Sequence, residues 1–322
     1  MLDYLGIDNY HITIDPQGDY IAHVDCWGKY LAPDKVLIAK LPQSNSHYAD
    51  YEAVANYFAT TNCCWGYPYK VYRVEEPGGS TLAPYTNSLI LNKTVYVPLG
   101  SNNTYNQRAL QVYRDAMPGY EVVGVSNTSY STGWLNTDAL HCRTRGVMDF
   151  DMLYVDHRNV LFGTQECKDS IAITSKFIAY SGDPLKEDSL LIYYSVDGGP
   201  YQTAHMTATG APDEYVGYIK GYHPDSEVDY YVFGADESGH RYQQPVFGEL
   251  DPHHFTAHIT FIRGDVNDDG NVNLDDLTTL INFLLGDIPS PFSRAAANVD
   301  SDSDYEINMS DLTALINMLL EN

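Results

Sequence analysis

The sequence of 322 residues predicts three folds in succession: an α/β region, an antiparallel β-sandwich, and a small α-helical region with acidic loops. Three observations support this prediction. Strands and helices alternate in residues 1–166, short strands without a helical period fill residues 167–258, and two acidic loops each precede an apolar helix in residues 259–322. A chain of this length is expected to hold two or three domains with separate cores.

The α/β region repeats one arrangement of elements. Strands are predicted at residues 35–39, 69–74, 88–91, 94–98 and 120–126, and helices at residues 48–60 and 107–117. Each strand-helix-strand unit buries its apolar face only by stacking on further copies. Two copies are therefore expected to form part of a larger ring.

The middle region reads as an antiparallel sandwich. Strands are predicted at residues 171–180, 189–194, 215–219 and 228–233. Turn sequences such as Asp197-Gly198-Gly199 and Glu237-Ser238-Gly239 separate them. Short strands at this spacing are typical of a small sandwich.

Charge and hydropathy exclude several classes of protein. The formal net charge is −25, which disfavours binding to nucleic acid or to anionic membranes. Residues 259–322 hold 12 acidic and 2 basic residues, a local excess that needs an explanation. No apolar run approaches the ~18 residues of a transmembrane helix, so membrane insertion is not expected. The five cysteines are an odd number without the spacing of a disulfide framework or a zinc site.

The acidic loops have the ligand spacing of a calcium site. The first places oxygen-bearing side chains at loop positions 1, 3, 5, 9 and 12, and Gly270 permits the sharp turn near its middle. The second starts 35 residues later, at Asp300, with the same spacing. A solvated acidic linker is the alternative, but it would not repeat its spacing twice and lead into an apolar helix both times. The helices are predicted at residues 277–285 and 312–320.

These paired loops resemble the type I dockerin, a module that docks onto cohesin domains. Aspartate at position 12 of each loop, where an EF-hand normally has glutamate, supports the resemblance. It implies calcium ligands at Asp265, Asn267, Asp269, Asn273 and Asp276 in the first loop, and at Asp300, Asp302, Asp304, Asn308 and Asp311 in the second. Asn271 and Glu306, at position 7, are implied to contribute backbone carbonyls.

Two distant segments suggest nucleophilic chemistry. Residues two apart in a strand face the same side, so His23 and Asp25 are expected to reach one ligand, although a structural histidine is the alternative. Cys142 lies in a polar, turn-prone segment, which favours a nucleophile with a distant histidine as its base. The remaining candidates, Cys63, Cys64 and Cys167, are expected to be buried and inert.

Three ordered segments resemble the C-terminal half of the agmatine deiminase and bacterial peptidylarginine deiminase family: residues 20–33 (YIAHVDCWGKYLAP), 84–92 (PYTNSLILN) and 137–144 (TDALHCRT). The resemblance implies a pentein fold, the five-bladed α/β propeller of guanidine-modifying enzymes. It is strongest with the bacterial peptidylarginine deiminase, in which an immunoglobulin-like domain follows the catalytic domain. Residues 167–258 fit that place.

The same resemblance implies the role of each site residue. Cys142 attacks the guanidinium carbon, His23 protonates the departing ammonia and then activates water, and Asp25 accepts hydrogen bonds from the guanidinium nitrogens. Asn87 and Tyr20 correspond to positions that line the substrate site. The intermediate is a thiouronium, the product a ureido group, and no cofactor takes part.

The chain supplies about two of the family's blades. The family's second guanidine-binding aspartate, and the arginines that bind a peptide's terminal carboxylate, fall outside it. We therefore expect this chain alone to be inactive, or poorly folded in residues 1–166, as in a fragment or the product of a misplaced start codon.

The leading functional prediction is a secreted or cell-surface enzyme that deiminates arginine in peptides, attached to a cohesin through its dockerin. An agmatine deiminase acting on a small guanidine is one alternative. A non-catalytic extracellular adhesion protein with a calcium module is the other.

Overall fold

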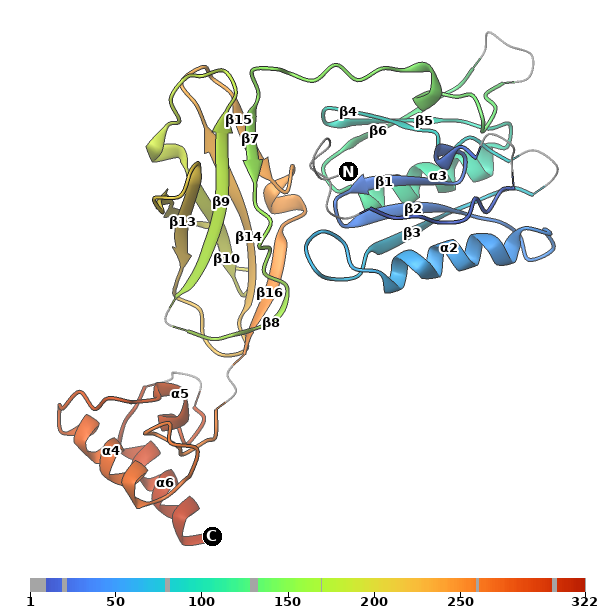
Figure 1. Ribbon diagram of the computed structural model, residues 1–322. Coiled ribbons are helices and arrows are strands. Elements are labelled where there is room, and N and C mark those ends of the chain that lie inside the picture. Colours follow the sequence, from blue (N-terminus) through green and yellow to red (C-terminus); the bar gives the residue numbers. More distant parts are fainter. Residues whose placement is uncertain are drawn as a thin grey trace.

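The computed structural model describes residues 10–18, 22–78, 82–127, 133–168, 170–258, 261–302 and 306–321. Figure 1 shows an α/β unit, a β-sandwich beside it, and a helical module beyond the sandwich. Each has a hydrophobic core of its own. The predicted order of α/β, sandwich and helical regions is observed.

The α/β unit contains two sheets of three strands with the same topology. In the first, β1 (Gly28–Ala32) pairs antiparallel with β2 (Lys35–Lys40), which pairs parallel with β3 (Lys70–Glu75). In the second, β4 (Leu89–Leu91), β5 (Thr94–Pro98) and β6 (Glu121–Val125) repeat this pattern. The internal repeat predicted from the sequence is therefore present as two hairpin-helix-strand units.

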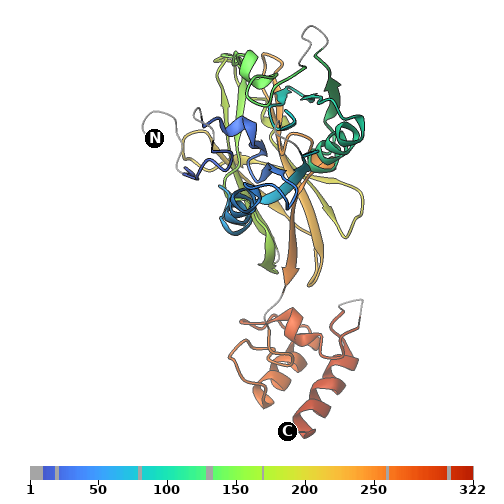
Figure 2. The ribbon, with the colours of Figure 1, turned by 90° about the vertical axis from the view of Figure 1, so that its right-hand side faces the viewer.

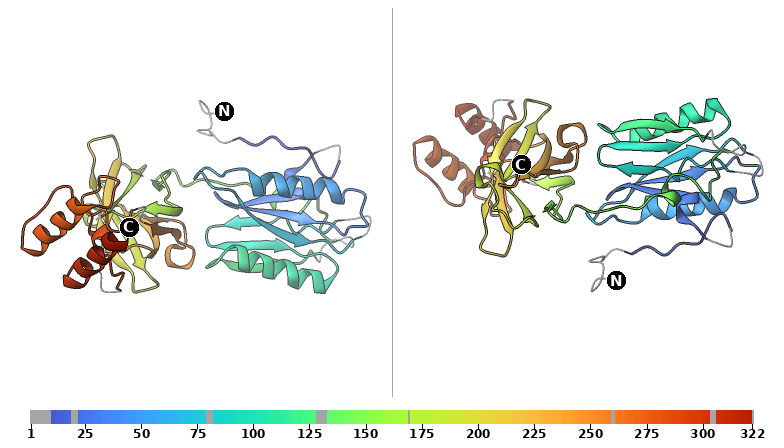
Figure 3. Two further views of the ribbon diagram at one scale, coloured as in Figure 1. Left: turned by 90° about the horizontal axis from the view of Figure 1, so that it is seen from below. Right: turned by 90° about the horizontal axis from the view of Figure 1, so that it is seen from above.

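Two helices connect the parallel strands of these sheets. Helix α2 (Tyr48–Thr60) packs against β2 and β3, and α3 (Asn103–Ala116) packs against β6 and also against β3. Figure 3 shows the strands of both sheets between the two helices. Helix α3 begins earlier than predicted because the Asn102 side chain caps it, accepting hydrogen bonds from Thr104 N at 3.0 Å and Tyr105 N at 3.4 Å. Among the described residues the two sheets share one core but do not close into a barrel.

The sandwich consists of two antiparallel-rich sheets. One is ordered β12 (Thr207–Ala208), β13 (Glu214–Ile219), β9 (Ile171–Ala179) and β7 (Leu153–Asp156). The other is ordered β11 (Gln202–His205), β10 (Leu191–Val196), β14 (Glu227–Ala235), β16 (His253–His258) and β8 (Gly163–Glu166), with β15 (Arg241–Gln244) paired to β14. Three-residue helical turns, η3 (Glu187–Ser189) and η4 (Gly248–Leu250), interrupt the connections. Phe177, Tyr230 and Phe255 are fully buried between the sheets.

The start of the sandwich lies earlier than the boundary expected at residue 166. Strand β7 pairs with β9, and β8 pairs parallel with β16 through residues 163–166. Both strands therefore belong to sheets of the sandwich, although they precede Cys167. The sequence did not reveal them because each has only four residues and β8 has little apolar pattern.

The helical module contains α4 (Leu274–Leu284), a short α5 (Arg294–Ala297) and α6 (Met309–Glu321). Val266, Leu280 and Leu315 are fully buried in its core. Figures 1 and 2 place the module beyond the end of the sandwich at which β16 finishes. In the described part of the chain no helix is both long and apolar enough to cross a bilayer.

The α/β unit contacts the sandwich directly. Lys35, at the start of β2, has its Nζ 2.5 Å from Asp251 Oδ2 of the sandwich. Tyr120 and Phe247 pack with ring centroids 4.5 Å apart. A cavity of about 690 Å³ lies at this interface, lined by side chains from both units.

Candidate active site

His23 and Asp25 lie on a short helical turn rather than on a strand. The turn η1 (Val24–Cys26) begins directly after His23, and Ala22 has a positive φ of 47°. This break in the extended backbone explains why the predicted strand is wrong. The turn nevertheless keeps the two side chains together, because His23 Nδ1 lies 3.9 Å from Asp25 Oδ1.

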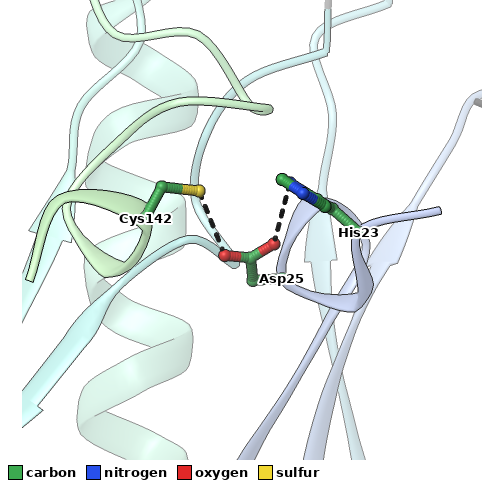
Figure 4. Close-up of side chains that lie close together, drawn as sticks. All are labelled: His23, Asp25 and Cys142. Atoms are coloured by element: carbon green, nitrogen blue, oxygen red, sulfur yellow. Dashed lines mark hydrogen bonds and ion pairs between the residues drawn. The ribbon is translucent and has the colours of Figure 1, made fainter. Parts of the chain in front are cut away.

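Cys142 comes from a second turn, η2 (His141–Arg143), more than a hundred residues further along the chain. Its Sγ donates a hydrogen bond to Asp25 Oδ2 at 3.2 Å. Figure 4 shows Asp25 between the other two side chains, with Cys142 on one side and His23 on the other. One ligand atom each of His23, Asp25 and Cys142 lies within 4.8 Å of the others.

Asn87 forms hydrogen bonds to residues of both turns. Its Nδ2 donates to Asp25 Oδ2 at 3.0 Å and to Cys142 Sγ at 3.0 Å. Its Oδ1 accepts from the backbone N–H of His141 at 3.0 Å and of Cys142 at 3.4 Å. The side chain is fully buried, and it contacts both Asp25 and Cys142.

His141 is a site residue that the sequence analysis missed. Its Nδ1 lies 2.7 Å from Asp25 Oδ2, and about half of its side chain is exposed. Asp25 Oδ2 therefore meets three partners, from Asn87, His141 and Cys142. The His-Cys pair in the sequence was a usable signal, but only the fold brings residue 141 to residue 25.

Burial shapes the electrostatics of the site. Burial raises the pKa of the Cys142 thiol; the Asn87 amide partly opposes this, and the Asp25 carboxylate adds to it. Lys29, on β1, is a second residue missed from the sequence, and its Nζ donates to Ser88 O at 2.5 Å. Burial lowers the pKa of Lys29 to about 8, and Asp25 opposes that shift. The Cys142 thiol therefore keeps its proton to a higher pH than a free cysteine does, because burial raises its pKa.

Two further predictions about this region have different outcomes. Tyr20 lies outside the described residues. Cys63 is buried as expected, but Cys64 is exposed and Cys167 is half-buried, so the expectation of burial is wrong for those two. Cys64 lies just after α2, in the turn that leads to β3, where its side chain faces solvent.

The first acidic loop folds around Asp265 and Asp276, which are both buried. Asp265 Oδ2 accepts the N–H of Gly270 at 2.9 Å, and Asp269 N donates to Asn267 Oδ1 at 3.1 Å. Asp276 accepts the N–H groups of Asn267 and Asn273 at 3.0 and 2.8 Å. Asn273 caps α4, and Asn271 N donates to Asp269 at 2.9 Å.

The second loop repeats the arrangement that closes the first. Asp311 is buried and accepts the N–H groups of Asp300 and Asn308 at 3.3 and 2.9 Å. Asp302 N donates to Asp300, and Asn308 Nδ2 donates to Glu306 O. Asp304 lies outside the described residues.

The buried carboxylates of both loops fit a hard cation. No ion pair among the described residues involves Asp265, Asp276 or Asp311. A carboxylate removed from water without a positive partner is costly, and the backbone N–H groups offset only part of that cost. Oxygen-only loops of this length suit calcium.

Two parts of the chain match known protein families. Residues 3–147 match the family model of the Porphyromonas-type peptidyl-arginine deiminase. Residues 263–320 match the type I dockerin domain. The resemblance to these two families is therefore confirmed, and the three residues of Figure 4 lie within the deiminase match.

Solved deiminase structures align with about two fifths of the chain. An arginine deiminase from Porphyromonas gingivalis is 24% identical, with 37% of this chain and 36% of that chain covered and a TM-score of 0.32. An agmatine deiminase from Enterococcus faecalis is 22% identical, with 37% and 38% covered and a TM-score of 0.32. An agmatine deiminase from C. jejuni is 15% identical, with 39% and 40% covered and a TM-score of 0.31. The chain spans less than two fifths of the P. gingivalis structure and of the E. faecalis structure.

Proposed function

We propose that this protein hydrolyses the guanidino group of arginine in peptides to a ureido group and ammonia. The observation that supports this is the convergence of His23, Asp25 and Cys142 within 4.8 Å from two distant segments. A thiol beside an imidazole and a carboxylate is the arrangement that covalent attack on a planar cation requires.

In the proposed reaction, the guanidinium approaches Asp25 and replaces hydrogen bonds now made to its Oδ2. The arriving cation favours the thiolate of Cys142, whose proton passes to His23. The thiolate then attacks the guanidinium carbon and forms a C–S bond. Ammonia leaves with a proton from His23. Water then gives a proton to His23 and adds to the carbon, and the C–S bond breaks to release the ureido product.

Arginine within a peptide is favoured over a small guanidine because the site is open. The His23 side chain is 43% exposed and that of His141 is 53% exposed, so both are accessible to a bulky substrate such as a peptide. Agmatine is the alternative substrate. A non-catalytic adhesion protein is the alternative from another functional class. If this alternative holds, Cys142 should react with alkylating agents no differently from an exposed cysteine.

We further propose that the α/β unit is part of a pentein propeller and that the sandwich is immunoglobulin-like. Type I dockerins bind calcium and dock onto cohesins, so the helical module is proposed to attach the enzyme to a cohesin. The proposed location is extracellular or at the cell surface, which is typical of dockerin proteins. The buried loop carboxylates support calcium as the ion.

An alkylation experiment on the full chain tests the proposed chemistry without requiring turnover. An amidinium-bearing alkylating agent and neutral iodoacetamide are compared, and labelling of each cysteine is read by mass spectrometry. Cys142 is expected to prefer the cationic reagent, and Asp25→Asn is expected to reduce that preference about tenfold. Exposed Cys64 is the internal control and is expected to show no preference.

Turnover is then measured as ureido product from arginyl peptides and from agmatine. Cys142→Ala is expected to abolish it, whereas Cys64→Ala retains it. Product formation by Cys142→Ala, or an unchanged reagent preference in Asp25→Asn, contradicts the proposal. Faster turnover of agmatine than of peptides selects the alternative substrate.

A further inference from the structure

The residues proposed for catalysis are also a set of transition-metal ligands. His23 offers an imidazole nitrogen, Asp25 a carboxylate oxygen and Cys142 a sulfur, all within 4.8 Å of one another. Among the described residues this is the one group of three such side chains brought so close. Zinc takes this mixture of nitrogen, oxygen and sulfur ligands in proteins.

The distances from the Asp25 carboxylate to its two neighbours are close to those between ligands of a four-coordinate ion. With zinc bonds of ~2.0–2.3 Å, ligand atoms of a tetrahedral site lie roughly 3.3–3.8 Å apart. Cys142 Sγ lies 3.2 Å from Asp25 Oδ2, and His23 Nδ1 lies 3.9 Å from Asp25 Oδ1. The His23 side chain is 43% exposed, so it can rotate to close the remaining gap.

Neighbouring groups complete the surroundings of such an ion. Three protein ligands leave a fourth position open to water, as in sites that exchange their metal or substrate. His141 Nδ1 and Asn87 Nδ2 both contact Asp25 Oδ2, at 2.7 and 3.0 Å. Such outer contacts orient a ligating carboxylate and tune its affinity for the metal.

The sulfur ligand separates this site from the acidic loops. Calcium and magnesium select oxygen ligands, whereas thiolate selects zinc and cobalt. The loops of residues 265–276 and 300–311 contain no cysteine and therefore offer no thiolate. The same chain therefore presents two regions with opposite metal preferences.

We propose that His23, Asp25 and Cys142 bind a thiophilic divalent cation such as Zn²⁺. The cation binds the Cys142 sulfur and so competes with the guanidino substrate. Binding forms a zinc–sulfur bond and releases the thiol proton to solvent. The inference shares its residues with the proposed function but does not depend on turnover.

Cobalt titration of the full chain, with calcium in excess to fill the loops, tests this site. Co²⁺ is expected to produce a sulfur-to-cobalt charge-transfer band and the visible bands of four-coordinate cobalt, with one equivalent bound. Zn²⁺ is expected to abolish both. Cys142→Ser is expected to lose the charge-transfer band, and His23→Gln to weaken binding by roughly tenfold or more. Cys64→Ser, at an exposed cysteine, is expected to leave the spectrum unchanged.

A protection experiment on the unaltered protein covers the case in which a variant fails to fold. Zn²⁺ is expected to slow alkylation of Cys142 by iodoacetamide, while Ca²⁺ has no effect and Cys64 is labelled at the same rate throughout. The absence of the charge-transfer band, its survival in Cys142→Ser, or the absence of protection overturns the zinc site. Cobalt binding without preference for the amidinium reagent would instead overturn the deiminase proposal alone.

Discussion

Asn87 shows how one buried residue can fix a site built from distant segments. Its amide nitrogen contacts Asp25 and Cys142, and its amide oxygen contacts the backbone of residues 141 and 142. Every polar group of this side chain is therefore satisfied inside the protein. A side chain of the same size that lacks either the donor or the acceptor would leave buried polar groups without a hydrogen-bond partner.

Asn87→Asp tests this role. The change replaces a donor by an oxygen at 3.0 Å from Asp25 Oδ2, so two carboxylates would face each other in a buried place. We expect a loss of about 1–3 kcal/mol in the free energy of unfolding. Thermal melting followed by tryptophan fluorescence measures it, since Trp27, Trp65 and Trp134 all lie in the first half of the chain.

Asn56→Asp is the matched control, because Asn56 is exposed on α2. It should change the melting temperature little. Equal melting of both variants would show that the Asn87 contacts do not stabilise the unit.

The sequence predicted the residues that we propose for catalysis but not how they are held. His23, Asp25 and Cys142 were found from residue chemistry and family motifs. His141 and Lys29 were missed because a histidine beside a cysteine, or a lysine on a strand, has no special meaning until the fold places it near Asp25. Asn87 was found, but its burial, and hence its role, was not.

At the scale of elements, the regular helices and strands were the most predictable parts. Helix α2 has the bounds predicted from its pattern, and β5 does too. The turn at residues 24–26 was predicted as strand because a three-residue helix is too short to show a period. Helix α4 starts before its apolar stripe because the Asn273 capping box fixes its first turn.

Glu76, directly after β3, makes the stability of the α/β unit depend on pH. It is buried, its Oε2 accepts the N–H of Ala83 at 2.6 Å, and burial raises its pKa to about 8. The unfolded carboxyl ionises near pH 4.5, while the folded one remains protonated up to about pH 8. The unfolded state thus binds fewer protons in this window, and stability falls as the pH rises through it.

Glu76→Gln is expected to remove this dependence, because glutamine keeps an oxygen for Ala83 but cannot ionise. The variant should melt several degrees higher than the unaltered protein at pH 8 and at nearly the same temperature at pH 4.5. Tryptophan fluorescence again reports the unit. Glu75→Gln, at the exposed neighbouring carboxylate, serves as control, and an equal gain at pH 8 would contradict the role of Glu76.

The loop that precedes α4 predicts a calcium dependence. Asp276 is buried and both of its oxygens accept backbone N–H groups, so its removal should disrupt the loop as well as the cation site. Calcium is expected to raise the melting temperature of the helical module, and Asp276→Ala to abolish that effect at this loop. Calorimetric titration of the full chain with calcium measures the lost binding.

Asp275→Ala is the control, because Asp275 is exposed and directly precedes Asp276. This variant should retain calcium binding. Binding that survives in Asp276→Ala would contradict the assignment of this residue as a ligand.

At the scale of the whole molecule, the order of the three regions was predictable and their contacts were not. Composition and periodicity separate the regions, but strands β7 and β8 join the sandwich only through pairing with β9 and β16. Long-range pairing of this kind leaves no local pattern. The contact between Lys35 and Asp251 joins residues more than two hundred positions apart and was equally hidden.

This contact should couple the unfolding of the α/β unit to that of the sandwich. The Lys35 side chain is 5% exposed, and its Nζ donates to Ala116 O at 3.1 Å as well as to Asp251. Lys35→Met is expected to cost about 1–3 kcal/mol, since both acceptors lose a charged donor. Tryptophan fluorescence and far-ultraviolet circular dichroism should then give separate transitions.

Lys168→Met, whose ion pair with Glu166 is largely exposed, should leave melting unchanged and serves as control. A single coincident transition in Lys35→Met would show that the contact does not couple the two units.

The parallel pairing of β8 with β16 has a mechanical consequence. In the chain, β8 follows the α/β unit, and β16 precedes the helical module. If the module is anchored and flow drags on the rest, tension pulls the two strands lengthwise in opposite directions. Rupture then requires the four registered pairs from Phe255–Gly163 to His258–Glu166 to slide together, which resists force better than opening them one at a time.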